Sequence, residues 1–209
     1  IKTFAVTEVY DIPLLRETVL DNDILVMRST CVEEEAKTIA QYDCIATIGS
    51  LSSAEVMDKV SKELGKKTKC HLKIDTGMGR YGFLPSQVES AIKCYDFENL
   101  DFCGAYTHFS SAFHNVQLTK VQLEMFKDTI KQIEKAGKSV GKLHASNSPA
   151  LLNVDGVSLD AVRIGSAFTG RVITKDKNPL NRLGKLEAQV IETKTVPAGY
   201  SIGYNGQYK

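Results

Sequence analysis

The sequence predicts an α/β protein, with a (β/α)8 barrel of the TIM type over residues 1–180 and the start of a β-rich C-terminal domain over residues 181–209. Short apolar runs alternate with stretches of helical periodicity at intervals of about twenty residues. About seven such units in a row favour a closed barrel over an open, doubly wound sheet. Residues 175–181 are polar and contain Pro179, which indicates a domain boundary near Leu180.

Each predicted strand is a short apolar run, and each predicted helix repeats its apolar residues with helical spacing. In chain order the strand and helix pairs are Phe4–Thr7 and Ile12–Leu20, Ile24–Met27 and Val32–Tyr42, Cys44–Ile48 and Ser53–Leu64, Cys70–Ile74 and Ser86–Tyr95, Phe102–His108 and Leu118–Ala136, Leu143–Ser146 with a short helix from Ser148, and a last strand Ala161–Ile164. The longest helix carries one apolar stripe that we expect to pack on the core, formed by Leu118, Val121, Met125, Ile130 and Ile133.

These strand candidates are one short of a full barrel. The chain starts almost directly in a strand at Ile1, so we expect that the first βα unit is absent from this sequence. Beyond the boundary, Leu186, Ala188 and Val190 alternate with polar or charged residues. This alternation predicts an exposed antiparallel strand over Lys185–Val196, in the second domain.

The composition favours a small-molecule partner. Acidic and basic residues are interleaved and the net charge is +1, which gives no basic field for nucleic acid and no cationic surface for a membrane. No apolar run approaches the roughly 20 residues that span a bilayer, and no signal-peptide pattern is seen, so we expect a cytoplasmic protein. Five cysteines without CxxC spacing suggest buried thiols rather than a disulfide framework or a zinc site.

Polar residues follow the ends of successive strands, where ligand chemistry gathers in a barrel. The run His71–Phe83 leads from a strand into three glycines that bracket Arg80, a pattern that fits a ligand loop or a tight turn with a solvated arginine. Arg163, in an apolar strand, needs a ligand or an ion-pair partner. Ser148 either caps its helix or helps to hold a phosphate.

The sequences of these segments resemble those of the alanine racemases, the pyridoxal-phosphate (PLP) enzymes that interconvert L- and D-alanine. The run from His71 to Phe83 is similar to their KxDTGMGRxGF signature. Four further segments follow in the family's order: Tyr106-Thr107-His108-Phe109, Ala145-Ser146-Asn147-Ser148, Val162-Arg163-Ile164-Gly165 and Gly203-Tyr204. Three departures, Pro149, Phe113 and Ile164, concern the substrate more than the chemistry.

The resemblance implies a role for each matching residue. Arg163 would hydrogen-bond the pyridine nitrogen of PLP, with His108 beside the cofactor and bonded to Arg163. Arg80 would lie near the phenolic oxygen of PLP and the substrate carboxylate. The remaining cofactor-binding residues, which include the phosphate-binding ones, would be Asn147, Ser148, Gly165 and Ser166. His71, His114 and His144 have no such support, and we expect them to be structural.

Two further matches concern a lysine and a tyrosine. Lys73 matches a lysine that is carbamylated in many family members and supports the Arg80 position, although an unmodified lysine fits the sequence equally. Tyr204 matches the catalytic tyrosine, which serves the partner subunit's site in a homodimer; Tyr200 and Tyr208 are the alternatives if the register differs. The second base would be the PLP-binding lysine, on the strand that precedes Phe4 in the family.

The sequence therefore predicts a PLP-dependent alanine racemase that acts by a two-base mechanism and supplies D-alanine for the cell wall. The nearest competing hypothesis keeps the chemistry and changes the substrate to serine or a broader set of small amino acids. More distant hypotheses are a non-catalytic PLP-binding homologue, a phosphate-binding barrel enzyme without PLP, and a decarboxylase of the related barrel class.

Overall fold

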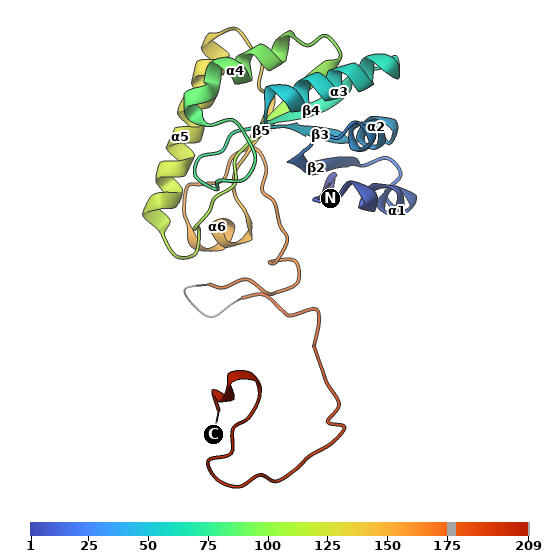
Figure 1. Cartoon of the computed structure of the whole chain (residues 1–209). Helices are drawn as coiled ribbons and strands as arrows, with labels where there is room; N and C mark the ends of the chain where they lie inside the picture. The colour runs from blue at the N-terminus through green and yellow to red at the C-terminus, as the bar shows by residue number, and fades with distance from the viewer. Residues whose placement is uncertain (175–178, 209) are drawn as a thin grey trace.

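A computed structural model of the chain describes residues 1–174 and 179–208. Six parallel strands form one curled sheet in the order of the chain, β1-β2-β3-β4-β5-β6 (Figure 1). The strands are β1 Thr3–Val6, β2 Asp23–Ser29, β3 Ile45–Ile48, β4 Thr68–Lys73, β5 Leu100–Tyr106 and β6 Lys142–His144. The helices between and after them are α1 Ile12–Thr18, α2 Glu33–Gln41, α3 Leu51–Glu63, α4 Val88–Lys93, α5 Val116–Lys135 and α6 Ser148–Asn153. Each predicted strand through Leu143–Ser146 and each predicted helix has a counterpart here.

The sheet is buried between its helices and the barrel interior. All four residues of β3 are buried, as expected for a parallel strand covered on both faces. One apolar cluster runs through the sheet and the helices α1 to α5, and includes Ile24, Ile39, Met57 and Ile133. Because the strands are parallel, their carboxyl ends lie at one rim of the sheet, where the residues that follow β4, β5 and β6 meet.

Two predicted strands are wrong. Within the predicted strand Ala161–Ile164, only Ala161 forms a single bridge, to His144, and Arg163 lies in the loop beyond it. Residues 181–197 contain no strand, because the alternating segment has no partner there: Leu186 is 94% exposed and Ile191 is 93% exposed. Part of the predicted linker, residues 175–178, lies outside the described residues.

The apolar stripe predicted on α5 is only partly correct. Ile130 and Ile133 are buried, whereas Leu118, Val121 and Met125 are 41%, 45% and 39% exposed. The helix instead buries a face of mixed character. Its polar residues are Thr119, Gln122 and Thr129, and its apolar residues are Leu123, Phe126, Ile130 and Ile133. Periodicity of apolar residues cannot detect a buried face of this kind, because it counts every polar residue as exposed.

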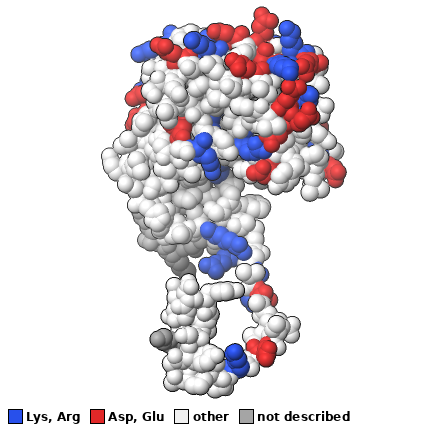
Figure 2. Space-filling view, viewed as in Figure 1, with Lys and Arg blue, Asp and Glu red and all other residues white. Residues whose placement is uncertain are grey.

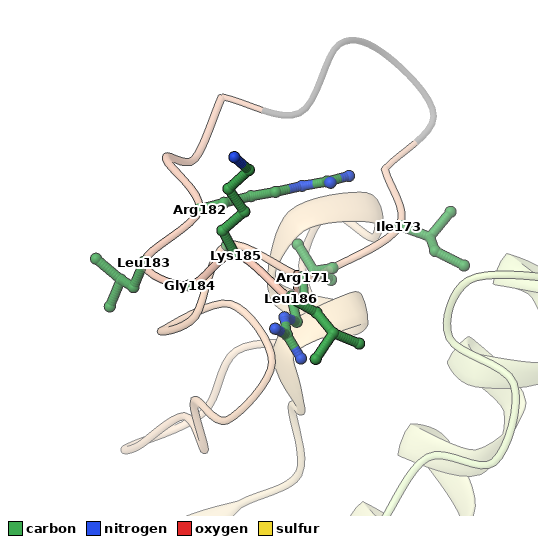
Figure 3. Close-up of a pocket in the computed structure, with 9 residues that line it drawn as sticks. Arg171, Ile173, Arg182, Leu183, Gly184, Lys185 and Leu186 are labelled. Carbon is green, nitrogen blue, oxygen red and sulfur yellow. The ribbon is translucent and has the colours of Figure 1, made fainter. Parts of the chain in front are cut away.

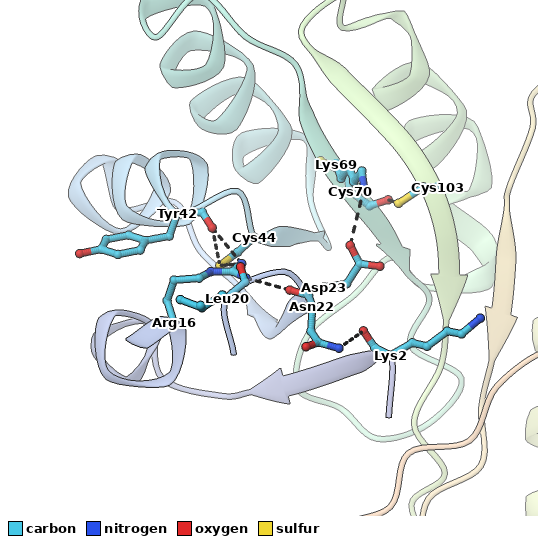
Figure 4. Close-up of polar contacts among 10 residues, drawn as sticks. All are labelled: Lys2, Arg16, Leu20, Asn22, Asp23, Tyr42, Cys44, Lys69, Cys70 and Cys103. Atoms are coloured by element: carbon cyan, nitrogen blue, oxygen red, sulfur yellow. Dashed lines mark hydrogen bonds and ion pairs between the residues drawn. The ribbon is translucent and has the colours of Figure 1, made fainter. Parts of the chain in front are cut away.

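The opposite rim of the sheet is closed by polar contacts (Figure 4). The guanidinium of Arg16 donates to the carbonyl oxygens of Asn22 at 2.8 Å and Tyr42 at 3.0 Å, which joins the α1–β2 and α2–β3 connections. Nζ of Lys69 on β4 lies 3.6 Å from Oδ1 of Asp23 on β2 and forms an ion pair with it. Of the five cysteines, Cys44, Cys70 and Cys94 are buried, Cys103 is half-buried and Cys31 is exposed, and all are free thiols.

The face of the barrel seen in Figure 2 shows no concentration of one charge. Figure 2 shows lysines, arginines and carboxylates interspersed on the visible face of the barrel. Among the described residues, no helix has both the length and the apolar character needed to cross a membrane.

Candidate active site

The glycine-rich run predicted to hold an arginine is a compact turn after β4. Asp75 organises it: Oδ1 accepts the N–H groups of Gly77 at 2.9 Å and Met78 at 2.7 Å, and Oδ2 accepts that of Arg80 at 3.0 Å. Burial raises the pKa of the Asp75 carboxyl, but these N–H donors outweigh it and the net pKa is lowered. The turn therefore carries an ionised aspartate at its base and presents Arg80, which is exposed, at its tip.

Gly82 closes this turn against the strand. Its φ is +113°, and a Cβ at this position would lie 2.9 Å from both the Asp75 nitrogen and the Lys73 oxygen. The N–H of Phe83 donates to the Lys73 oxygen at 2.9 Å, and the N–H of Asp75 donates to the Phe83 oxygen at 2.8 Å. A glycine is required here by both the backbone conformation and the close approach.

Lys73 ends β4 inside the barrel, and its side chain is 1% exposed. Its Nζ lies 4.8 Å from the centre of the Tyr106 ring and has no hydrogen-bond partner among the described residues. Burial, followed by the charges of Arg163 and Arg80, lowers the pKa of Lys73 from 10.5 to about 8. Most of this amine is therefore protonated near neutral pH, and a minor fraction is neutral and nucleophilic.

Arg163 is the centre of the buried polar network. Its Nη2 donates to the carbonyl oxygens of Thr107 and Ala145, each at 2.8 Å, and its Nη1 contacts His144 Nδ1 at 2.7 Å. Burial lowers the pKa of Arg163 to about 10, so the guanidinium remains charged at neutral pH. Its buried Nε has no hydrogen-bond partner among the described residues.

Two histidines extend this network into the barrel. An arginine can only donate, so His144 Nδ1 accepts and the ring carries its hydrogen on Nε2. His144 Nε2 lies 2.9 Å from His71 Nδ1 and donates to it. Burial and the charge of Arg163 lower the pKa of His144 to about 2, and burial lowers that of His71 to about 4, so both rings are neutral.

Tyr106 supports the same cluster from the side. Its ring stacks on the His144 ring with centroids 4.7 Å apart, and Cζ of Arg163 lies 5.2 Å from the centre of the Tyr106 ring. Its hydroxyl donates to the Met27 oxygen at 2.8 Å and lies 2.9 Å from Thr47 Oγ1. Our expectation that His71 and His144 are only structural missed their link to Arg163; the signal available was that both stand near the ends of strands that line the barrel.

His108 lies beside this network rather than at its centre. Its Nδ1 is 3.5 Å from Arg163 Nη2, and its Nε2 is 3.5 Å from Asn147 Nδ2. A neutral imidazole has one acceptor nitrogen, so at most one of these long contacts is a hydrogen bond. Burial, with the charge of Arg163, lowers the pKa of His108 to about 4. Arg163 is thus bonded more closely to His144 than to the predicted His108.

The start of α6 faces the loop after Ala161. The N-cap of α6 is Asn147, whose side chain accepts the N–H of Ala150 at 3.1 Å, so Ser148 is not the cap. The buried Ser148 hydroxyl instead accepts the N–H groups of Gly165 at 3.0 Å and Ala167 at 3.2 Å. These contacts bring Ser148 to the exposed Gly165–Ser166 segment, the residues that the resemblance assigns to the cofactor.

Tyr204 is not brought to this cluster. It lies in a short 3-10 turn, Tyr204–Gly206, near the C-terminus, where it is 99% exposed and remote from the barrel (Figure 1). A pocket of about 810 Å³ lies between residues 170–173 and 182–186 (Figure 3), and none of the predicted site residues lines it. The described residues contain no group of three or more His, Cys, Asp and Glu side chains that could hold a metal ion.

A family model described as "Alanine racemase, N-terminal domain" matches residues 1–172. The chain belongs to the alanine racemase family. The alanine racemase of Methanococcus maripaludis is 34% identical over 179 residues, which cover 82% of this chain and 48% of that protein. The alanine racemase of Treponema denticola is 34% identical over 209 residues, which cover 96% of this chain and 55% of that protein. The chain therefore spans about half the length of these curated relatives.

Solved alanine racemases share the fold. The enzyme of Clostridium difficile 630, in complex with cycloserine, superposes with a TM-score of 0.81 at 28% identity, over 87% of this chain and 51% of that one. The alanine racemase of Bacillus anthracis with bound L-Ala-P gives a TM-score of 0.76 at 26% identity, over 98% of this chain and 54% of that one. The likeness confirms that the curled sheet belongs to a TIM-type alanine racemase barrel.

Proposed function

We propose that the full-length protein is a PLP-dependent racemase that interconverts L- and D-alanine. The observation that carries this proposal is the half-buried, charged Arg163. Its guanidinium is held by His144 and two carbonyl oxygens, and its buried Nε has no partner among the described residues. A desolvated cation of this kind, at the strand ends of an alanine racemase barrel, suits an anionic cofactor that offers a ring nitrogen as acceptor. The relatives solved with cycloserine and with L-Ala-P support a small amino-acid ligand.

The residues present fit PLP. Lys73, Arg80 and Arg163 are cationic groups near one another, while the histidines beside them are neutral, so the region is suited to a phosphate ester and a carboxylate. Arg163 Nε–H would donate to the pyridine nitrogen. The Ser148 hydroxyl, whose oxygen already accepts from Gly165 and Ala167, retains its own hydrogen for a phosphate oxygen. Asn147 and Ser166 would complete the cofactor site.

When bound, PLP supplies an electron sink for the negative charge that develops at the substrate Cα. Arg163 keeps its charge at neutral pH and therefore disfavours protonation of the ring nitrogen, which limits that sink and suits racemisation. Arg80 would hold the substrate carboxylate. A carbamate on the Lys73 amine would convert the unpartnered cation into an anion that supports Arg80.

Tyr204 would exchange a proton with Cα on one face, and a lysine upstream of Ile1 would do so on the other. Tyr204 is 99% exposed and lies in a segment outside the barrel, so it is free to serve the site of a second subunit in a homodimer. Its phenol needs cationic neighbours to act as a base near neutral pH, and Arg80 would supply one. A cytoplasmic location and a role in D-alanine supply for the cell wall belong to the same proposal.

The direct test is chiral analysis of full-length protein incubated with PLP and L-alanine, D-alanine or L-serine. We expect both alanine enantiomers to approach an equal mixture, with L-serine turned over at least about tenfold more slowly. Faster turnover of serine would move the proposal to a serine or broad-specificity racemase. Stoichiometric PLP binding without turnover of any small amino acid would instead identify a non-catalytic PLP-binding homologue.

A further inference from the structure

Gln122 is a buried amide on α5 that the proposed site does not use. It is 1% exposed and belongs to the polar part of the buried face of the helix. Its Oε1 accepts the N–H of Ser110 at 3.2 Å and lies 3.3 Å from the Ser110 hydroxyl, while its Nε2 donates to the Thr76 oxygen at 3.2 Å. One side chain therefore joins the segments that follow β4 and β5.

The Thr76 contact lies at the root of the turn that carries Arg80. Gly77, the next residue, has a φ of +129°, and a Cβ there would lie 3.0 Å from Gln122 Nε2. The N–H of Gly77 is in turn held by Asp75, which also holds the N–H of Arg80. Gln122 therefore fixes the first peptide of the turn whose geometry presents Arg80.

The Ser110 contact lies on the opposite segment, two residues after His108. There the Phe109 oxygen accepts Asn147 Nδ2 at 3.2 Å, so this segment is held on one side by α6 and on the other by α5. The hydroxyls of Thr76 and Thr107, 2.7 Å apart, already join the two strand ends deeper in the barrel. Gln122 makes the corresponding connection farther out, where the chain turns away from the strands.

We propose that Gln122 is a positioning residue that fixes the separation between the Arg80 turn and the His108–Ser110 segment. It acts through these two backbone segments and makes no contact with substrate, and its consequence for catalysis rests on the proposed function. An amide suits this task because its oxygen accepts hydrogen bonds while its nitrogen donates them. A buried amide oxygen or nitrogen without a partner lowers the stability of the folded protein.

Amide hydrogen exchange of the full-length protein tests the structural part. In Gln122→Glu the carboxylate still accepts from Ser110 but cannot donate to Thr76, so we expect peptides over residues 75–83 to exchange at least about fivefold faster, with residues 108–115 little changed. In Gln122→Met both peptides should exchange faster. The matched control is Gln132→Met on the same helix, because Gln132 is exposed and its Nε2 donates to the Asp128 oxygen within α5. Unchanged exchange over 75–83 in both Gln122 variants would overturn the proposal.

Racemisation kinetics test the functional part. We expect Gln122→Glu to raise the KM for alanine about tenfold with a smaller change in kcat, because Arg80 would hold the carboxylate less accurately. A fall in kcat at unchanged KM would contradict positioning of Arg80. If the wild-type protein shows no racemisation, the proposed function fails but the exchange result still decides whether Gln122 orders the turn. If the wild-type protein is active and exchange is unchanged, the positioning role alone fails.

Discussion

The guanidinium of Arg163 determines where the hydrogens of two histidines lie. Because it donates to His144, His144 must donate to His71, and both rings are held neutral by burial. The sequence motif identified Arg163 but not the His71–His144 pair. The role of a histidine depends on which side chains from other strands lie beside it in the barrel interior, and the sequence does not show this. The same interior explains why Lys73 has a lowered pKa.

A first prediction concerns Arg163→Lys. The single ammonium group of lysine cannot replace the guanidinium's hydrogen bonds to His144 and to the Thr107 and Ala145 oxygens. Some of these three acceptors therefore lose their hydrogen-bond donor. We expect the free energy of unfolding to fall by about 1–3 kcal/mol, measured by urea denaturation of the full-length protein. An unchanged midpoint would show that these contacts do not stabilise the strand ends.

A second prediction concerns pH. The pKa of His71 is lowered from 6.5 to about 4, so between these values the unfolded chain binds a proton that the folded protein does not. The folded protein therefore loses stability as the pH falls through this window. For each such histidine, the folding equilibrium constant falls by up to roughly tenfold per pH unit. We expect His71→Asn to flatten the dependence of unfolding on pH between 6.5 and about 4. The exposed His114 offers the control, and a His114→Asn variant that flattens the curve equally would refute the assignment.

At the level of elements, the glycine-rich turn depends on glycine for two different reasons. Gly79 has a φ of +69° and open space where a Cβ would stand, with nothing within 4 Å, whereas Gly82 has a φ of +113° and two backbone atoms at 2.9 Å. The two positions therefore separate conformational strain from steric exclusion.

A third prediction follows from this difference. We expect Gly79→Ala to cost about 1 kcal/mol through strain, and Gly82→Ala to cost clearly more because backbone atoms must move as well. Thermal unfolding of the full-length variants, together with exchange over residues 75–83, measures both effects. Equal losses at the two positions would mean that the close approach at Gly82 is relieved without cost.

The strands and helices also show which parts of the fold can be predicted from the sequence. Short apolar runs located the six described strands, most plainly β3, whose four residues are all buried. Arg163 was misplaced into a strand since Val162 and Ile164 flank it, although only Ala161 forms a bridge. The buried face of α5 was missed in part because Gln122 and its polar neighbours satisfy their hydrogen bonds inside the protein.

For the whole molecule, the barrel and the residues at its strand ends were predictable, whereas the position of Tyr204 was not. Lys73, His108, Asn147, Ser148 and Arg163 gather at one rim because parallel strands place their carboxyl ends together. Tyr204 and the alternating segment 185–196 are exposed and have no partner strand in the described residues. The chain spans about half the length of its curated relatives, and the proposed contacts of these segments would lie outside residues 1–209, where local sequence patterns cannot locate them.

The central claim is that this barrel binds PLP with Arg163, while the lysine that carries the cofactor lies outside residues 1–209. Borohydride reduction of the full-length protein with PLP, followed by peptide mass mapping, tests it most directly. We predict that the pyridoxyl group is found on a lysine upstream of Ile1, and that Lys73 is free of it. An adduct on Lys73, or on any other lysine of this chain, would contradict the proposed arrangement of the site.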